Sequence, residues 1–427
     1  MTPNPERSPV VDTLHPLINQ KVTDFLIIGG GVLGIAVARE IRRVFPDCSV
    51  LVIEKEAAPG LHASGRNSGV LHAGFYYTED SLKARFTREG NERLTQYCLE
   101  HGLSLNRCGK LVVARDESEL PILNELFRRG RINGVRLEKL SSNDVREIEP
   151  RALTCQKALF SPTTSVVDPR EVMASLVRDA QDIGVRVQAD TAFIGYRSGR
   201  VMTSKGAISA GYIVNAGGLY ADRIATEFSF SKSYRILPFK GLYVYGKEPP
   251  GAIRTNVYPV PRLENPFLGV HVTVTAGGRV KLGPTAIPVL WREHYRGMEN
   301  FNLREMLSTF GTGKHLFTGS NFQLLKLGMS ELLGGSKRGI VESASALVSG
   351  LKPGDYRDWG QPGIRAQLLD IRNGQLVMDF LWEGDSKSFH ILNAVSPAFT
   401  CSLSFSEYIV GKIGGLLNGL PPVGQEC

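Results

Sequence analysis

The 427-residue sequence lacks the features that define several protein classes. It has no run of about 18 consecutive apolar residues, which excludes a membrane-spanning helix. Its six cysteines are widely separated and include no C-x-x-C pair, so they indicate neither a zinc site nor a disulfide framework. No metal is expected, and the cysteine pattern favours a reducing, cytoplasmic compartment.

Charge is also limited. Only 22% of the residues are charged and no run of five Lys or Arg residues occurs, so a disordered chain is excluded and nucleic-acid binding is not expected. The net charge of +8 still favours anionic partners, which leaves open a small anionic substrate or a peripheral attachment to an acidic membrane surface. Residues 1–22 lack the apolar segment of a secretory signal and are predicted to form a flexible tail.

What the sequence does contain points to a large globular chain. Its length exceeds the roughly 250–300 residues at which a single core stops growing, and 42% of the residues are hydrophobic, so two domains are expected. Residues 25–28 form a short apolar run before several glycines, which is typical of a strand buried on both faces of a parallel sheet. Helical spacing over 32–44 and a second apolar run at 49–53 complete one predicted βαβ unit.

Local signals predict the other elements. Ser81 and Asp168, the latter followed by proline, are expected to cap helices over 81–101 and 168–182. Three short β-type runs within 185–214 predict an antiparallel meander, whose last strand returns to the parallel sheet. Residues 237–290 are strand-rich and 303–347 mostly helical. Strands are predicted at 376–381 and 389–392, before a helix from about residue 399.

The glycines after the first strand fit G-x-G-x-x-G at the position where a dinucleotide-binding site needs it. Gly29 allows a tight turn, Gly31 lets the backbone approach a pyrophosphate, and Gly34 lets helix and strand pack closely. Glu54, at the end of the second strand, is placed to accept a hydrogen bond from a ribose hydroxyl. The carboxylate argues against NADP, while the motif leaves NAD and FAD open.

Further motifs carry a family resemblance. The run GRNSGVLHAGFYY at 65–77, CGK at 108–110, PFKG at 238–241, YPVP at 258–261, GIRAQ at 363–367 and NAVSPA at 393–398 occur in order along the chain. With them the chain resembles the FAD-dependent oxidoreductases related to D-amino acid oxidase, and among these the branch that acts on L-2-hydroxyglutarate. It departs from that pattern at Arg66, at Thr285, and in the C-terminal turn at Val395, Phe399 and Cys401.

The resemblance implies FAD as cofactor and a two-domain α/β fold. The FAD-binding domain is expected to be Rossmann-like, with a parallel sheet and the β-meander, over residues 23–90, 151–235 and 360–427. The substrate domain, over 91–150 and 236–359, is expected to have a mainly antiparallel sheet flanked by helices. The isoalloxazine ring would lie between them.

The resemblance and the motif together select candidate site residues. His72 and His271 are the candidate bases for the substrate hydroxyl, and Arg365 is the candidate carboxylate clamp. Arg66, Lys110, Lys240 and Tyr258 are further substrate candidates. The residues expected to hold the cofactor are Gly29, Gly31, Gly34, Glu54, Lys55, Asn67, Ser68, Gly69, Ala216, Gly217, Ser396, Pro397, Ala398 and Thr400.

The function expected is oxidation of a 2-hydroxy acid, with L-2-hydroxyglutarate to 2-oxoglutarate as the first reaction to test. It would proceed by hydride transfer from the α-carbon to flavin N5. An amino acid or secondary amine oxidase of the same fold is the alternative. A third hypothesis, motivated only by the net charge, is an FAD-containing protein that modifies or binds RNA. The electron acceptor is left open between oxygen, a quinone and another carrier.

Overall fold

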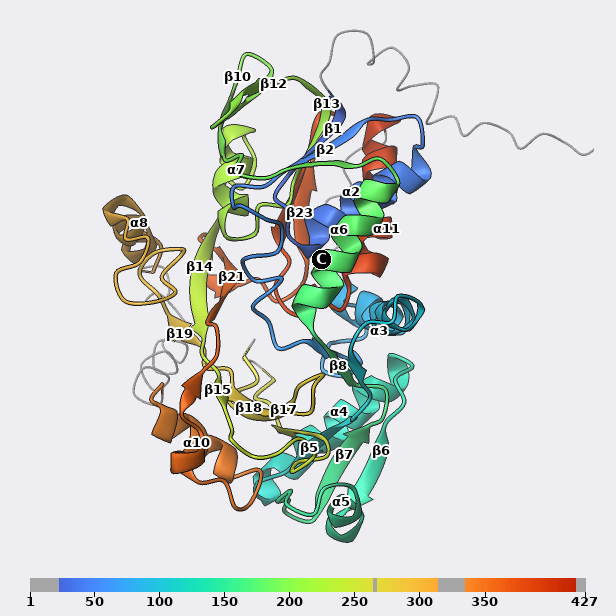
Figure 1. Ribbon diagram of the computed structural model, residues 1–427, viewed down its shortest axis with the longest axis vertical. Coiled ribbons are helices and arrows are strands. Elements are labelled where there is room, and N and C mark those ends of the chain that lie inside the picture. The colour runs from blue at the N-terminus through green and yellow to red at the C-terminus, as the bar shows by residue number, and fades with distance from the viewer. Residues whose placement is uncertain (1–22, 264–266, 314–334, 420–427) are drawn as a thin grey trace, which may run out of the picture.

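The computed structural model describes residues 23–263, 267–313 and 335–419, which form one elongated molecule (Figure 1). The predicted tail and part of the predicted helical region at 303–347 lie outside the described residues. The β-meander lies at one end of the long axis, and the strands β6 (Glu138–Ser141) and β7 (Lys157–Ser161) lie at the other. No helix in the described ranges combines the length and the apolar character needed to cross a membrane.

A six-stranded sheet carries the predicted βαβ unit. Five of its strands are parallel and the edge strand β23 is antiparallel to β24. The order is β23 (Leu381–Gly384), β24 (Ser388–Asn393), β13 (Ala210–Asn215), β1 (Thr23–Ile28), β2 (Val50–Ile53) and β9 (Arg186–Gln188). The strand predicted at 376–381 is wrong, because the short β22 (Gln375–Leu376) ends before the chain enters β23.

Both faces of this sheet are covered, which explains the continuous apolar strands. Phe25 and Ile27 pack against helices on one face, while Leu26 and Ile28 pack on the opposite face. The helices of the first face are α2 (Val32–Val44), α3 (Leu82–Glu100), α6 (Pro169–Asp182) and α11 (Ser402–Leu417). The second face is covered by the meander β10 (Phe193–Arg197), β11 (Arg200–Thr203) and β12 (Gly206–Ile208), and by α7 (Ala221–Glu227).

The predicted caps are confirmed. The Ser81 hydroxyl accepts a hydrogen bond from the Ala84 amide at the start of α3, and the Asp168 carboxylate accepts one from the Arg170 amide at the start of α6. Each cap satisfies an amide that has no partner within its helix. The last helix begins at Ser402, three residues after its predicted start.

An eight-stranded, mainly antiparallel sheet forms the other half of the molecule. Its order is β20 (Asp358–Trp359), β15 (Val244–Tyr245), β18 (Val280–Gly283), β17 (His271–Val274), β16 (Asn256–Pro259), β5 (Lys110–Val113), β7 (Lys157–Ser161) and β6 (Glu138–Ser141). It is flanked by the helices α4 (Leu120–Ile132), α5 (Ser142–Ile148) and α10 (Lys337–Ser345). Helix α8 (Leu303–Gly313) lies beside β14 (Tyr234–Gly241).

The strand register separates two kinds of side chain on this sheet. The apolar core on one face of the sheet includes Leu111, Val257 and Val272, which lie in register on neighbouring strands. Because successive residues of a strand point to opposite faces, Lys110 and His271 lie on the other face. Lys281, paired with Thr273 on the neighbouring strand, shares that face. One face is therefore apolar and the other carries buried cationic and polar groups.

Two smaller sheets connect the large ones. In the four-stranded sheet, β14 (Tyr234–Gly241) and β21 (Gly363–Asp370) pair along their full length, with β19 (Ile287–Pro288) and β22 at the edges. The other sheet contains β3 (Val70–Leu71), β8 (Ser165–Val167) and β4 (Leu105–Asn106). The predicted domain borders remain predictions. The pairing of β7 with β5, however, joins a segment predicted for the FAD-binding domain to the eight-stranded sheet.

Candidate active site

Two positions at the junction of β1 and α2 accept only glycine. Gly29 has φ +111°, and a Cβ atom there would lie 2.5 Å from the Ala216 carbonyl oxygen at the end of β13. A Cβ atom on Gly34 would lie 1.9 Å from the Gly29 carbonyl oxygen. The first turn of α2 therefore packs directly on the backbone, and the helix N-terminus lies at the carboxyl ends of the parallel strands.

Glu54 holds this turn in place. Its carboxylate accepts hydrogen bonds from the Gly30 amide at 2.7 Å and from the Glu56 amide at 3.0 Å, and the side chain is only 8% exposed. A carboxylate offers about four acceptor positions, so two remain for a ligand. The predicted ribose contact is compatible with this arrangement, and Glu54 also has a structural role that the sequence did not reveal.

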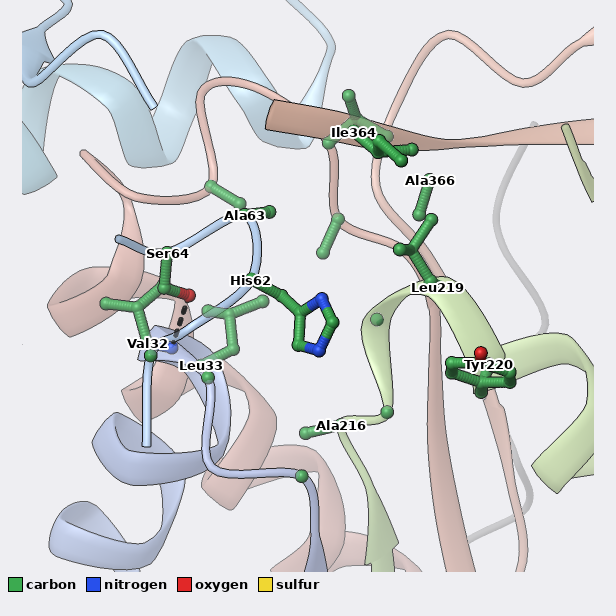
Figure 2. A pocket seen from close by; sticks show the side chains of 18 of the residues that line it. Val32, Leu33, His62, Ala63, Ser64, Ala216, Leu219, Tyr220, Ile364 and Ala366 are labelled. Atoms are coloured by element: carbon green, nitrogen blue, oxygen red, sulfur yellow. Dashed lines mark hydrogen bonds between the residues drawn. The ribbon is translucent and has the colours of Figure 1, made fainter. Parts of the chain in front are cut away.

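A first cavity of about 600 Å³ begins at this turn. It extends between the six-stranded sheet and the loop that follows Glu54, where the Ser64 hydroxyl accepts a hydrogen bond from the Val32 amide at 2.9 Å. Figure 2 shows part of this wall, with the loop on one side and the segment from Ala216 to Tyr220 on the other. Such a long cavity beside a helix N-terminus and a glycine turn fits a dinucleotide.

His62 was not predicted, and its ring projects into the first cavity (Figure 2). Its two ring nitrogens contact the Tyr295 hydroxyl at 2.6 Å and the Glu56 carboxylate at 2.9 Å. Lys55 joins the same cluster through an ion pair with Glu293 at 2.7 Å. The cluster therefore fastens the loop after Glu54 to the segment that contains Glu293 and Tyr295. The sequence feature that could have pointed to His62 is its position in the glycine-rich connection after Glu54.

A second cavity of about 350 Å³ meets the first. It lies over the polar face of the eight-stranded sheet and includes Tyr258 and His271. The wall common to both cavities is formed by Ser68, His72, Tyr243, Pro284, Arg365, Val395 and Ser396. A ligand in the first cavity and a smaller ligand in the second would therefore lie next to each other at these residues.

The two candidate histidines are uncharged groups in this setting. Burial, followed by the nearby Lys110, lowers the pKa of His72 to about 3, and burial holds the pKa of His271 well below its usual range. His271 Nδ1 lies 2.9 Å from the Gly269 carbonyl oxygen, so it must donate a proton there. His271 Nε2 is then an acceptor. His72 Nδ1 is buried and has no hydrogen-bond partner among the described residues.

The candidate cations occupy different positions. Arg365 lines both cavities, and its Nη1 donates to the Thr285 carbonyl oxygen at 3.1 Å. Arg66 lines only the first cavity, where its guanidinium lies 4.2 Å from the centre of the Tyr295 ring. Lys240 lines neither cavity and reaches the Tyr295 carbonyl oxygen at 3.5 Å. Lys110 also lies outside both walls, behind the ring of Tyr258 at 5.0 Å.

The predicted cofactor residues mostly converge. Twelve of the fourteen line the first cavity. Gly34 and Gly69 do not. Gly34 serves the packing of α2, and Gly69 has φ +75° with its Cβ position 2.2 Å from the Val167 carbonyl oxygen. Both glycines therefore shape the backbone behind the wall. The assignment of individual contacts to the cofactor remains a prediction.

Comparison with known proteins gives a consistent relationship. A sequence model of the FAD dependent oxidoreductase family matches residues 24–381. The mitochondrial L-2-hydroxyglutarate dehydrogenase of Nematostella vectensis is 35% identical and covers 91% of this chain and 90% of its own length. The L-2-hydroxyglutarate dehydrogenase of Escherichia coli is 33% identical, covering 92% and 94%. The human mitochondrial protein of that name is 34% identical, covering 91% and 88%.

Solved structures share the fold. The L-alpha-glycerophosphate oxidase from Mycoplasma pneumoniae, with FAD bound, superposes with a TM-score of 0.73 at 21% identity, covering 93% of this chain and 94% of its own. The glycine oxidase from Geobacillus kaustophilus superposes with a TM-score of 0.69 at 20% identity, covering 95% and 96%. At these identities the likeness extends to the fold alone.

Proposed function

The chain belongs to the family of FAD dependent oxidoreductases, and on this basis we propose that it oxidises L-2-hydroxyglutarate to 2-oxoglutarate. The predicted resemblance and the predicted cofactor, FAD, are thereby confirmed. The observation that carries the proposal is the common wall of the two cavities, where a candidate base and a candidate carboxylate clamp, His72 and Arg365, lie together.

Each group has a defined task in the proposed reaction. When bound, FAD supplies the hydride acceptor. Arg365 would hold the carboxylate next to the reacting carbon, because its planar guanidinium can make two parallel hydrogen bonds to a carboxylate. The substrate hydroxyl must lose a proton as its carbon is oxidised. The protein therefore has to place a neutral base against that hydroxyl and to exclude water from the site.

We favour His271 as the base and keep His72 as the second candidate. The Gly269 carbonyl oxygen fixes the tautomer of His271 and leaves Nε2 as the proton acceptor. The Tyr258 ring, stacked on the imidazole at 3.7 Å, holds its orientation. His72 lines both cavities but has no comparable orienting partner at Nδ1.

The electron acceptor and the location of the protein follow as finer proposals. We propose a quinone or another carrier as acceptor, with the protein cytoplasmic and peripherally attached to a membrane. The support is an exposed apolar face on α8, where Leu303, Leu307 and Phe310 are 54%, 60% and 59% exposed and recur at helical spacing. Co-sedimentation with anionic vesicles tests this, since Leu307→Ser should reduce binding and leave the flavin content unchanged.

The reaction is tested by anaerobic addition of candidate substrates to the FAD-loaded protein. L-2-hydroxyglutarate should bleach the visible flavin band, while L-glutamate, glycine and L-proline should not. Bleaching by an amino acid but not by the hydroxy acid would overturn the proposal in favour of the amine-oxidising alternative.

A further inference from the structure

We infer that Tyr76, Tyr258 and Lys110 form a subsite for the second carboxylate of a dicarboxylic substrate. The inference rests on the proposed function for the reacting end of the substrate, and it adds the groups that would recognise the opposite end. These three residues belong to the polar face of the eight-stranded sheet and to the loop above it.

The first support is a group of buried polar atoms that lack partners. Lys110 Nζ and the hydroxyls of Tyr76 and Tyr258 are inaccessible to solvent and form no hydrogen bond within the described parts of the chain. The side chains of Lys110, Tyr258 and Tyr76 are 0%, 1% and 9% exposed. The Tyr258 hydroxyl lies close to the buried hydroxyl of Thr273. Because unpaired buried donors are costly, several at one place indicate a missing acceptor.

The second support is that the three residues lie together, with the Lys110 ammonium enclosed by aromatic rings. Lys110 Nζ lies 4.5 Å from the centre of the Tyr76 ring and 5.0 Å from that of Tyr258, with Phe75 at 4.6 Å on a third side. Tyr76 and Tyr258 line the second cavity, and Lys110 lies directly behind them. A carboxylate bound beside these two tyrosines in the second cavity would thus lie near the Lys110 ammonium.

The third support is charge. No carboxylate of the described residues pairs with Lys110, and the two cationic side chains whose charge acts on His271 are Arg365 and Lys110. A buried ammonium without a counter-ion is destabilising unless a ligand supplies the negative charge. The site as it stands is therefore complementary to an anion.

The two anionic ends of the substrate would then be bound separately. Arg365 lies on the common wall of the two cavities, whereas Tyr76 and Tyr258 line only the second cavity. A substrate held at both ends would keep its hydroxyl carbon between them, near the histidines. The enzyme would thus prefer a dicarboxylate, because a monocarboxylate leaves the two tyrosine hydroxyls and the buried ammonium without a partner.

The test compares glutarate with pentanoate, which have the same chain length, lack the hydroxyl group and differ in the second carboxylate. Their dissociation constants are measured on the FAD-loaded protein from the perturbation of the flavin spectrum. The variants are Tyr76→Phe, Tyr258→Phe and Lys110→Met, with Tyr196→Phe and Lys139→Met as controls. Lys139 is an exposed lysine outside the site. Its ammonium lies 4.5 Å from the centre of the Phe127 ring, so it makes the same kind of contact with an aromatic ring as Lys110 does.

Wild type should bind glutarate more tightly than pentanoate. Each site variant should weaken glutarate by about tenfold to a hundredfold, the loss expected for a hydrogen bond to a charged group, and pentanoate by less than about twofold. The controls should change neither constant. Equal weakening of both ligands, unchanged glutarate binding in the variants, or no preference in wild type would each overturn the inference.

The same experiment separates this inference from the proposed function. Glutarate has no hydroxyl to oxidise, so its binding reports the subsite even if L-2-hydroxyglutarate fails to bleach the flavin. Conversely, bleaching by L-2-hydroxyglutarate with unaltered affinity in all three variants would leave the proposed function standing and remove the subsite.

Discussion

The imidazole of His271 lies against the phenol ring of Tyr258, with the ring centres 3.7 Å apart and the planes inclined by 21°. The two residues come from neighbouring antiparallel strands and point to the same face of the sheet. This contact links the proposed base to the proposed carboxylate subsite, so that one side chain can serve recognition through its hydroxyl and orientation through its ring.

That dual role predicts a separation of binding from rate at Tyr258. Tyr258→Phe keeps the stacked ring and loses only the hydroxyl, so the apparent dissociation constant for L-2-hydroxyglutarate should rise while the flavin reduction rate at saturation stays nearly constant. Tyr258→Leu removes the ring as well, and the saturating rate should fall about tenfold or more, because small displacements of a base are costly. Anaerobic stopped-flow measures both. Equal saturating rates in the two variants would refute the orienting role.

The close packing of Gly34 predicts a sharp contrast between two glycines in helices. Gly34→Ala would place a methyl group 1.9 Å from the Gly29 carbonyl oxygen, so the protein should lose bound FAD and melt at lower temperature. Gly411→Ala in α11 meets no atom within 4 Å and should be neutral or stabilising by up to about 1 kcal/mol. The flavin-to-protein absorbance ratio and the melting temperature test this. Retention of FAD by Gly34→Ala would contradict the close approach.

The hydrogen bonds of Glu54 predict a strong effect of a small change. In Glu54→Gln one amide oxygen can accept from only one of the Gly30 and Glu56 amides, and the new NH₂ group faces the other. The FAD dissociation constant should therefore rise about tenfold or more. Equilibrium dialysis with FAD measures it. An affinity equal to that of wild type would show that the carboxylate does not fix the turn.

Burial lowers the pKa of Lys110 from 10.5 to about 7, which predicts a pH-dependent effect on stability. Between these values the unfolded chain binds a proton that the folded protein does not, so the stability of wild type should rise with pH. Lys110→Met removes this cost. It should melt higher than wild type below pH 7, and the difference should shrink as the pH approaches 10.5. A variant that melts lower throughout would indicate that the ammonium stabilises the fold.

The depressed pKa values of both histidines predict the pH profile of the reaction. Because burial keeps His72 and His271 neutral, the saturating rate of flavin reduction should not fall between pH 8 and pH 6, where an ordinary histidine would become protonated. Dicarboxylate affinity should fall above pH 7 as Lys110 loses its proton, and Lys110→Met should abolish that trend. A saturating rate that halves near pH 6.5 would contradict the neutral state.

The sequence predicted those features that depend on neighbouring residues. The strand, glycine turn and helix around Gly29, and the caps Ser81 and Asp168, follow from short-range rules and match the structure. The strand predicted at 376–381 failed because the chain leaves one sheet at Leu376 and enters another at Leu381. An apolar run alone cannot indicate such an exchange of partners.

The site itself depends on long-range pairing. From their residue type alone, Lys110 and Lys240 were equal candidates for substrate binding. The structure places them in different sheets, and the strand register decides which face each side chain occupies. His62 was missed because its role arises from contacts with Tyr295, more than two hundred residues away in the sequence. The family resemblance supplied the remaining candidates, including Arg365, which physical rules applied to one sequence would not have selected.

The central claim is tested most directly by a single turnover without oxygen. One equivalent of L-2-hydroxyglutarate is mixed with the FAD-loaded protein, and the flavin absorbance and the product are measured together. The account predicts loss of the oxidised flavin band with one 2-oxoglutarate formed per flavin reduced, and no loss with the D-enantiomer. An unchanged flavin spectrum in the presence of L-2-hydroxyglutarate would contradict it.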